Sequence, residues 1–141
     1  MGNLSQKLIE VLKKSGERIT PIRRALLENF CHYLKPQTPQ ELLTYLEKKG
    51  LMANKTTVYR QLEIMVQIGV IQEINFSDRS KRYELSSKDH HHHLVCQNCK
   101  KIEDINLDND LDKQEKKIWK KNHFRVLQHS LEFFGLCSKC Q

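Results

Sequence analysis

Apolar residues in the first half of the chain recur at helical spacing, and turn signals divide them into four predicted helices. Residues 4–12 form the first of these amphipathic runs. Threonine–proline pairs at 20–21 and 38–39 predict the starts of the second and third helices, because threonine is a good N-cap and proline suits the first helical position. Asn54 is the expected N-cap of a fourth helix, which Gly69 ends.

After the fourth helix the spacing of apolar residues changes from a helical period to a strand period. Residues 70–76 and 81–85 mix apolar and polar side chains around a polar turn at 77–80, which predicts a β-hairpin. Three basic residues stand at or beside its tip: Arg79, Lys81 and Arg82. Short helices followed directly by a basic hairpin indicate a winged helix-turn-helix.

The second half of the chain begins with a polar stretch at 86–90, which we interpret as a hinge. Four elements are predicted after it: strands at 91–96 and 101–105, a helix at 108–122 and a long strand at 123–134. We therefore expect an α+β fold, with a winged-helix domain over residues 1–85 and a small α/β domain over residues 86–141.

The charge of the chain is concentrated in its first half. The 141 residues include 24 Lys and Arg against 17 Asp and Glu, a net charge of +7. Residues 1–85 hold 14 of these basic and 9 of these acidic residues, so their net charge is +5. A basic surplus either keeps a surface soluble or attracts a polyanion such as nucleic acid. We find neither a long apolar run nor a signal peptide, and we expect a cytoplasmic protein with no membrane partner.

Two Cys-x-x-Cys pairs provide the most specific chemical signal. They are Cys96 with Cys99 and Cys137 with Cys140. Each two-residue loop presents both sulfurs to one metal, so four thiolates suit a tetrahedral, structural Zn²⁺ without an open ligand position. Redox dithiols and disulfides are the alternatives, and a cytoplasmic compartment disfavours disulfides. We interpret the fifth cysteine, Cys31, as a small buried residue of the second helix.

A run of four histidines precedes the first cysteine pair, at residues 90–93. On a strand, side chains alternate between faces, so His91 and His93 share one face while His90 and His92 share the other. Each pair can chelate a divalent ion if carboxylates or another histidine complete the site. The alternative is a solvated polar run that binds no metal.

These features together resemble the ferric uptake regulator (Fur) family. The resemblance rests on the run Thr56–Arg60, the histidines before Cys96, His129-Ser130-Leu131 and the last cysteine pair, in that order along nearly the whole chain. It implies a cytoplasmic homodimeric repressor with an N-terminal winged helix and a C-terminal α/β dimerisation domain. Such a repressor binds a double-stranded, AT-rich inverted repeat when it is loaded with a regulatory divalent metal, and has no catalytic residues or small-molecule substrate.

The resemblance also implies roles for individual residues. The four paired cysteines match structural zinc ligands. A sensing site for Fe²⁺, Mn²⁺ or Zn²⁺ is matched by Glu84, His91, His93 and Asp104. A second site in the dimerisation domain is matched by His90, His92, Asp112 and His129. The expected DNA-binding residues are Arg18, Thr56, Thr57, Tyr59 and Arg60, with Arg18 reaching the minor groove.

One expected ligand is missing from this chain. Members of the family draw a sensing-site histidine from the segment before the third helix, and residues 35–37 here are Lys-Pro-Gln. Either His32 or Gln37 substitutes, or Glu84 alone links the domains, or the coupling is weaker. The absence argues against peroxide sensing, whereas an aspartate at position 104 is typical of the peroxide-sensing branch.

Two other functional classes use similar ligands. A zinc enzyme has an open His and carboxylate site with a bound water, but the sequence has no His-Glu-x-x-His motif. A metal store or chaperone leaves the basic winged helix without a role. We therefore favour the regulator.

Overall fold

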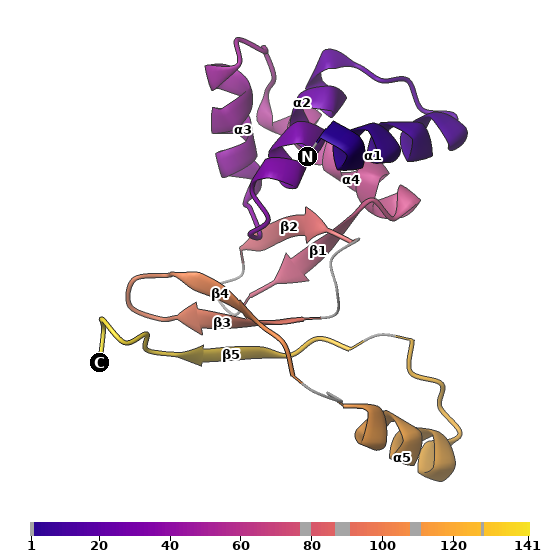
Figure 1. Cartoon of the computed structure of the whole chain (residues 1–141), viewed down its shortest axis with the longest axis vertical. Helices are drawn as coiled ribbons and strands as arrows, with labels where there is room; N and C mark the ends of the chain where they lie inside the picture. The colour runs from indigo at the N-terminus through magenta and orange to yellow at the C-terminus, as the bar shows by residue number, and fades with distance from the viewer. Residues whose placement is uncertain (1, 77–79, 87–90, 108–110, 128) are drawn as a thin grey trace. The chain divides into compact units, whose positions relative to one another are not determined.

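The computed structural model describes residues 2–76, 80–86, 91–107, 111–127 and 129–141. The chain forms two compact units, Met1–Lys88 and Asp89–Gln141 (Figure 1). Of the predicted hinge, only Ser86 is described, and the hinge remains a prediction. None of the helices in the described ranges has the length and apolar character needed to cross a membrane.

The described part of the first unit contains four helices, and the second, third and fourth begin at the predicted positions. They are α1 (Gly2–Lys14), α2 (Pro21–His32), α3 (Pro39–Lys48) and α4 (Lys55–Ile68). The Thr20 hydroxyl accepts a hydrogen bond from the Arg23 backbone N–H at 3.2 Å, and Asn54 Oδ1 accepts from Thr57 N–H at 2.8 Å. Gly69 ends α4 with a φ of 87°, a left-handed conformation that favours glycine.

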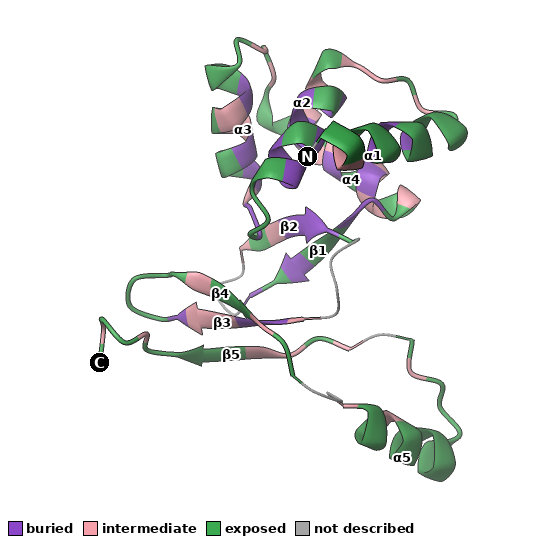
Figure 2. Ribbon diagram, in the orientation of Figure 1, coloured by how far each residue is buried: buried purple, intermediate pink, exposed green. Residues whose placement is uncertain are grey.

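The hydrophobic core lies in the first unit. Figure 2 shows buried positions on the inner faces of its helices and along both strands of its hairpin. Leu12, Leu26, Phe30, Leu46 and Leu62 have no exposed surface. Each such side chain contributes about 1.5–3 kcal/mol of burial free energy, so this unit has its own source of stability. Cys31 is buried in this core, as expected.

Strands β1 (Ile71–Asn75) and β2 (Lys81–Leu85) pair as an antiparallel hairpin directly after α4. The α2–α3 connection is joined to this hairpin because Gln37 and Tyr83 exchange two backbone hydrogen bonds of 2.9 Å. Of the predicted basic tip, Arg79 lies outside the described residues. Lys81 pairs with Glu73 at 3.6 Å, and the Arg82 guanidinium lies over the Phe76 ring.

In its described residues, the second unit is a three-stranded sheet with one helix. Its elements are β3 (His92–Cys96), β4 (Ile102–Ile105), α5 (Asp112–Asn122) and β5 (Glu132–Gly135). The strand order is β4-β3-β5, with β3 antiparallel to β4 and parallel to β5. Helix α5 has no buried residue, and the only buried residues described in this unit are His92, His93 and Cys96 (Figure 2).

The predicted long strand at 123–134 is wrong for most of its length. Strand β5 spans only Glu132–Gly135, the stretch that pairs with β3. His123 is instead the C-cap of α5, with a φ of 51°, and its N–H donates to the Trp119 carbonyl at 2.9 Å. A left-handed residue interrupts an extended conformation. The alternation of side chains in the sequence does not show which residues of this segment pair with a neighbouring strand. The other predicted elements are present, although residues 108–110 of the expected helix lie outside the described part.

Candidate metal centres and nucleic-acid interface

The four paired cysteines gather at one end of the second unit's sheet. Cys96 ends β3, and Cys99 lies in the tight turn that leads to β4. Cys137 and Cys140 follow β5, and the parallel pairing of Cys96 with Gly135 brings the end of the chain to this turn. The Gln97 N–H donates to the Gly135 carbonyl at 2.8 Å, which extends this pairing to the turn itself.

The spacing of the four sulfurs fits a metal ion rather than disulfides. All four lie within 4.8 Å of one another, and each cysteine is free. The Cys99 and Cys137 sulfurs are 3.7 Å apart, far beyond the roughly 2.0 Å of a disulfide. Tetrahedral Zn²⁺ with bonds of about 2.3 Å places its sulfurs about 3.8 Å apart. The arrangement therefore has the dimensions of a closed zinc site.

The thiols differ in their ease of ionisation. Backbone N–H groups of Cys137 and Cys99 lower the pKa of Cys96 to about 6. A hydrogen bond with Asn98 lowers the pKa of Cys140, but the Cys137 thiol, desolvation and the other two thiols raise it to about 11. Four thiolates at one point repel one another, and a divalent cation removes that penalty.

A second group of ligands lies on the neighbouring strands of the same unit. His93 and Asp104 are direct partners in the β3–β4 register, and His91 precedes β3. The His91 and His93 ring centroids are 4.9 Å apart, as the predicted alternation requires. His93 Nε2 lies 3.7 Å from Asp104 Oδ1, beyond hydrogen-bonding distance but close to the separation of two ligands on one ion. These three residues offer a divalent cation two nitrogens and an oxygen.

Glu84 lies on β2 of the first unit and is 1% exposed. Its direct partner in the β1–β2 register is Gln72, whose Nε2 donates to Glu84 Oε1 at 2.9 Å. A buried carboxylate is costly unless hydrogen bonds or a cation compensate its charge. The Gln72 amide therefore holds the Glu84 carboxylate within its own hairpin.

The two proposed substitutes for the missing histidine make contacts with Tyr33. The His32 ring packs edge-on against Tyr33, with centroids 4.5 Å apart. Gln37 is buried, and its Nε2 donates to the Tyr33 carbonyl at 3.4 Å. Both contacts lie within α2 and the α2–α3 connection of the first unit.

A third cluster contains two of the residues assigned to the second site. The rings of His92 and His129 stack with centroids 5.5 Å apart. His92 Nδ1 lies 3.1 Å from the Leu131 carbonyl, so this nitrogen carries the proton and donates, which leaves Nε2 as the metal-binding nitrogen. His90 lies outside the described residues.

The carboxylate in contact with His129 is Glu115, which the sequence analysis did not name. Glu115 Oε1 lies 2.7 Å from His129 Nδ1. Asp112 is exposed in the first turn of the same helix, three residues earlier. Residues three apart share a helix face, so Asp112 and Glu115 lie on the same face of α5, and the contact with His129 distinguishes Glu115 from Asp112.

The residues expected to contact DNA belong to the first unit. Four of them lie in the first two turns of α4, where Thr56 and Arg60 are exposed and Thr57 and Tyr59 are half-buried. Val58 and Leu62 on the opposite face of α4 are fully buried. Arg18 is exposed in the segment before α2. Helix α4 thus packs one face into the core and presents polar and basic side chains of its other face to solvent.

Comparisons with known proteins agree with this arrangement. Residues 14–134 match the family model described as the ferric uptake regulator family. The peroxide operon regulator of Bacillus subtilis is 33% identical over 135 residues, which cover 96% of this chain and 92% of that protein. The ferric uptake regulation protein of Campylobacter jejuni is 32% identical over 142 residues, covering 97% and 88%. The crystal structure of the Vibrio cholerae ferric uptake regulator has a TM-score of 0.76 and 28% identity, covering 92% of this chain and 98% of that one.

Proposed function

The chain belongs to the ferric uptake regulator family, and from this premise we propose that it is a cytoplasmic, metal-responsive repressor of transcription. The observation that carries the proposal is that one chain combines two chemically different ligand groups with a helical unit that ends in a β-hairpin. One group consists of four sulfurs, and the other of imidazoles and a carboxylate. A permanent structural metal and an exchangeable regulatory metal need different ligands. Soft thiolates retain Zn²⁺, whereas mixed nitrogen and oxygen ligands suit several divalent ions.

Cys96, Cys99, Cys137 and Cys140 hold the structural zinc in this proposal. Four protein ligands leave no position for water or substrate, so the ion crosslinks the β3–β4 turn to the end of the chain. The second unit has few buried residues, and small units with little core depend on such a crosslink.

His91, His93 and Asp104 bind the regulatory metal, and Glu84 completes the site from the first unit. A ligand from each unit makes metal binding depend on how the units are arranged, and this dependence is what an allosteric switch requires. Iron, manganese and zinc all suit these ligands. The relatives include a peroxide operon regulator and a ferric uptake regulation protein.

His92, His129 and Glu115 form the proposed second nitrogen and oxygen site, with His90 and Asp112 as further candidates. The contacts of His129 with Glu115 and with the His92 ring support this assignment. All three described residues belong to the second unit, so we assign this metal to the stability of the dimerisation domain.

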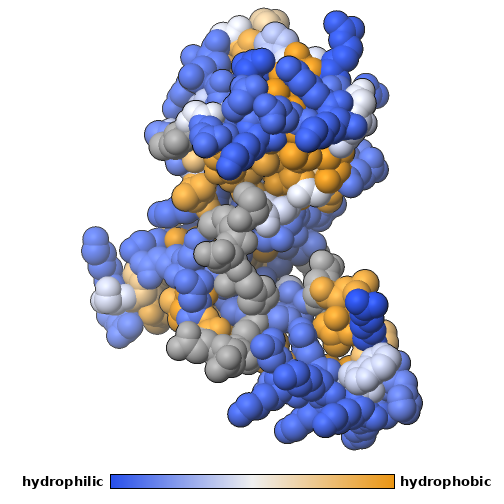
Figure 3. All heavy atoms as spheres, turned by 45° about the vertical axis from the view of Figure 1, so that its right-hand side comes forward, coloured by the Kyte–Doolittle hydropathy of each residue, from blue (hydrophilic) through white to orange (hydrophobic). Residues whose placement is uncertain are grey.

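We further propose a homodimer that forms through the second unit. Large apolar side chains reach its surface (Figure 3), among them Trp119, Phe124, Leu127, Phe133 and Leu136, which are 43% to 83% exposed. Strand β5 is an edge of the described sheet and carries Phe133 and Phe134. Apolar surface on an edge strand favours association with a second copy. A twofold dimer would present two α4 helices to an inverted repeat.

We expect Tyr59→Ala to weaken operator binding by about 5–150-fold, the range for loss of one base contact worth about 1–3 kcal/mol. Zinc content should not change, because Tyr59 lies in the first unit. Fluorescence anisotropy on a labelled AT-rich inverted-repeat duplex measures the affinity. Tyr33→Ala, at an exposed tyrosine outside α4, is the control and should change it less than twofold. Unchanged affinity of the Tyr59 variant would remove this residue from the interface.

A further inference from the structure

Arg23 is a buried arginine that none of the proposed metal or DNA contacts explains. It is 8% exposed, although it lies in the first turn of α2, next to solvent-exposed Arg24. A buried guanidinium is destabilising unless its charge and its N–H groups are matched by partners. The hydrogen-bonding partners of Arg23 therefore indicate what role its buried guanidinium has.

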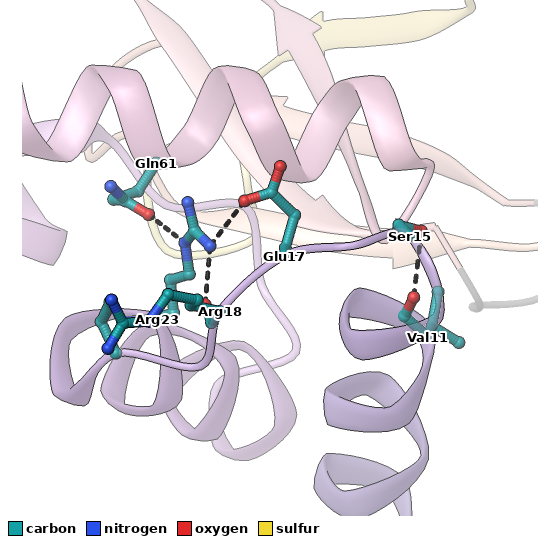
Figure 4. Close-up of polar contacts among 7 residues, drawn as sticks. Val11, Ser15, Glu17, Arg18, Arg23 and Gln61 are labelled. Atoms are coloured by element: carbon teal, nitrogen blue, oxygen red, sulfur yellow. Dashed lines mark hydrogen bonds and ion pairs between the residues drawn. The ribbon is translucent and has the colours of Figure 1, made fainter.

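Three hydrogen-bonding partners from two separate segments converge on the Arg23 guanidinium (Figure 4). Its Nε donates to Gln61 Oε1 at 2.6 Å. Its Nη1 donates to the Arg18 carbonyl at 2.6 Å and lies 2.7 Å from Glu17 Oε2. One rigid, planar group thus joins the segment before α2 to the helix α4.

The joined segments are the two that carry the expected DNA contacts. Gln61 follows Arg60 on α4, and Arg18 is the exposed residue that the resemblance assigns to the minor groove. Holding the Arg18 carbonyl restricts the peptide plane that follows its Cα, and this limits the directions in which the Arg18 side chain leaves the backbone. Glu17 is bound at the same nitrogen, so two consecutive residues of this segment are held.

We propose that Arg23 is a positioning residue for DNA binding, which holds the Arg18 arm at a fixed position relative to α4. The proposal rests on the DNA-binding function proposed above. The arm and the helix then engage one half-site as a preorganised pair, and binding does not pay for ordering the arm. Arg23 itself is buried and does not contact the duplex.

Arginine is required for this role because of its geometry. The guanidinium offers five N–H donors in a fixed plane, whereas the lysine ammonium is a compact group on a flexible stem. Arg23→Lys keeps the positive charge but cannot reach the Gln61 side chain and the 17–18 segment together. This substitution therefore separates positioning from net charge.

The test is a double-mutant cycle on operator affinity, using the full chain loaded with Zn²⁺ and Mn²⁺ and a labelled AT-rich inverted-repeat duplex. The four proteins are the wild type, Arg18→Ala, Arg23→Lys and the double variant. We expect Arg23→Lys to weaken binding about tenfold, and Arg18→Ala to have less than a twofold further effect in its presence. Arg24→Lys, at the adjacent exposed arginine, is the matched control and should change affinity less than twofold.

The salt dependence of binding distinguishes positioning from a general loss of folded protein. Loss of one cationic side chain from the duplex reduces the slope of log K against log salt by about 0.9, because fewer counterions are released, whereas a smaller folded fraction leaves this slope unchanged. If Arg23→Lys does not fold, Gln61→Met removes only the α4 partner and takes its place in the cycle. Additive effects of the two substitutions, or an unchanged salt slope, would overturn the proposal. A wild-type protein that does not bind the duplex would instead contradict the proposed function.

Discussion

Cys99→Ser is expected to release zinc from the chain and to unfold the second unit, while the first unit remains folded. Cys99 is exposed, so the substitution removes a metal ligand without creating a cavity. Structural zinc contributes about 10–16 kcal/mol to the folding of small zinc domains near neutral pH. The second unit cannot compensate for such a loss, because only three of its described residues are buried.

Metal analysis and hydrogen exchange measure the two parts of this expectation. Zinc should fall from about one ion per chain to near zero, and protection should disappear from β3, β4 and β5 but persist in α2 and α4. Cys31→Ser is the control, because Cys31 is buried in the first unit's core and should leave zinc content unchanged. A Cys99 variant that retains both its zinc and its protected sheet would show that the four cysteines are not the structural site.

The double substitution His91→Ala and His93→Ala is expected to abolish the response to added metal while structural zinc is retained. In the proposed function these imidazoles are two of the three ligands that the second unit contributes to the sensing site, and their rings lie 4.9 Å apart. Coupling free energies of about 1–3 kcal/mol are usual for allosteric sites, so the wild-type response should be about 5–150-fold in operator affinity. The variant should bind the operator with the weaker affinity whether or not Mn²⁺ is present.

His123→Asn is the matched control for this experiment. His123 caps α5 in a left-handed conformation that asparagine tolerates, and it is exposed. It should leave both the metal response and the zinc content unchanged. A full metal response in the His91 and His93 variant would mean that the regulatory metal binds elsewhere, with His92, His129 and Glu115 as the next site to test.

Local signals in the sequence predicted the first unit well. Thr20, Thr38 and Asn54 mark helix starts because each side chain satisfies a backbone N–H within three residues of itself. The same reasoning predicted the hairpin after Gly69 and the shared face of His91 and His93. These features depend only on neighbours in the chain.

Features that depend on long-range contacts could not be predicted from spacing. The parallel pairing of β3 with β5 determines where the last strand starts, and alternation along 123–134 contains no information about its partner. The contact of Glu115 with His129 depends on how α5 lies against the segment before β5. The sequence does not distinguish Arg23 from its neighbour Arg24, and only the structure shows that Arg23 is buried and hydrogen-bonded to Gln61 and the Arg18 carbonyl.

The most direct test of the central claim is a fluorescence-anisotropy titration of the wild-type chain on an AT-rich inverted-repeat duplex at fixed salt. The protein is first treated with a mild chelator that leaves the thiolate-bound zinc in place, and it is then titrated with and without Mn²⁺. The account predicts that Mn²⁺ tightens binding by about 5–150-fold. Equal affinity in both titrations would contradict a metal-responsive switch, and metal uptake without any binding to the duplex would indicate a metal store instead.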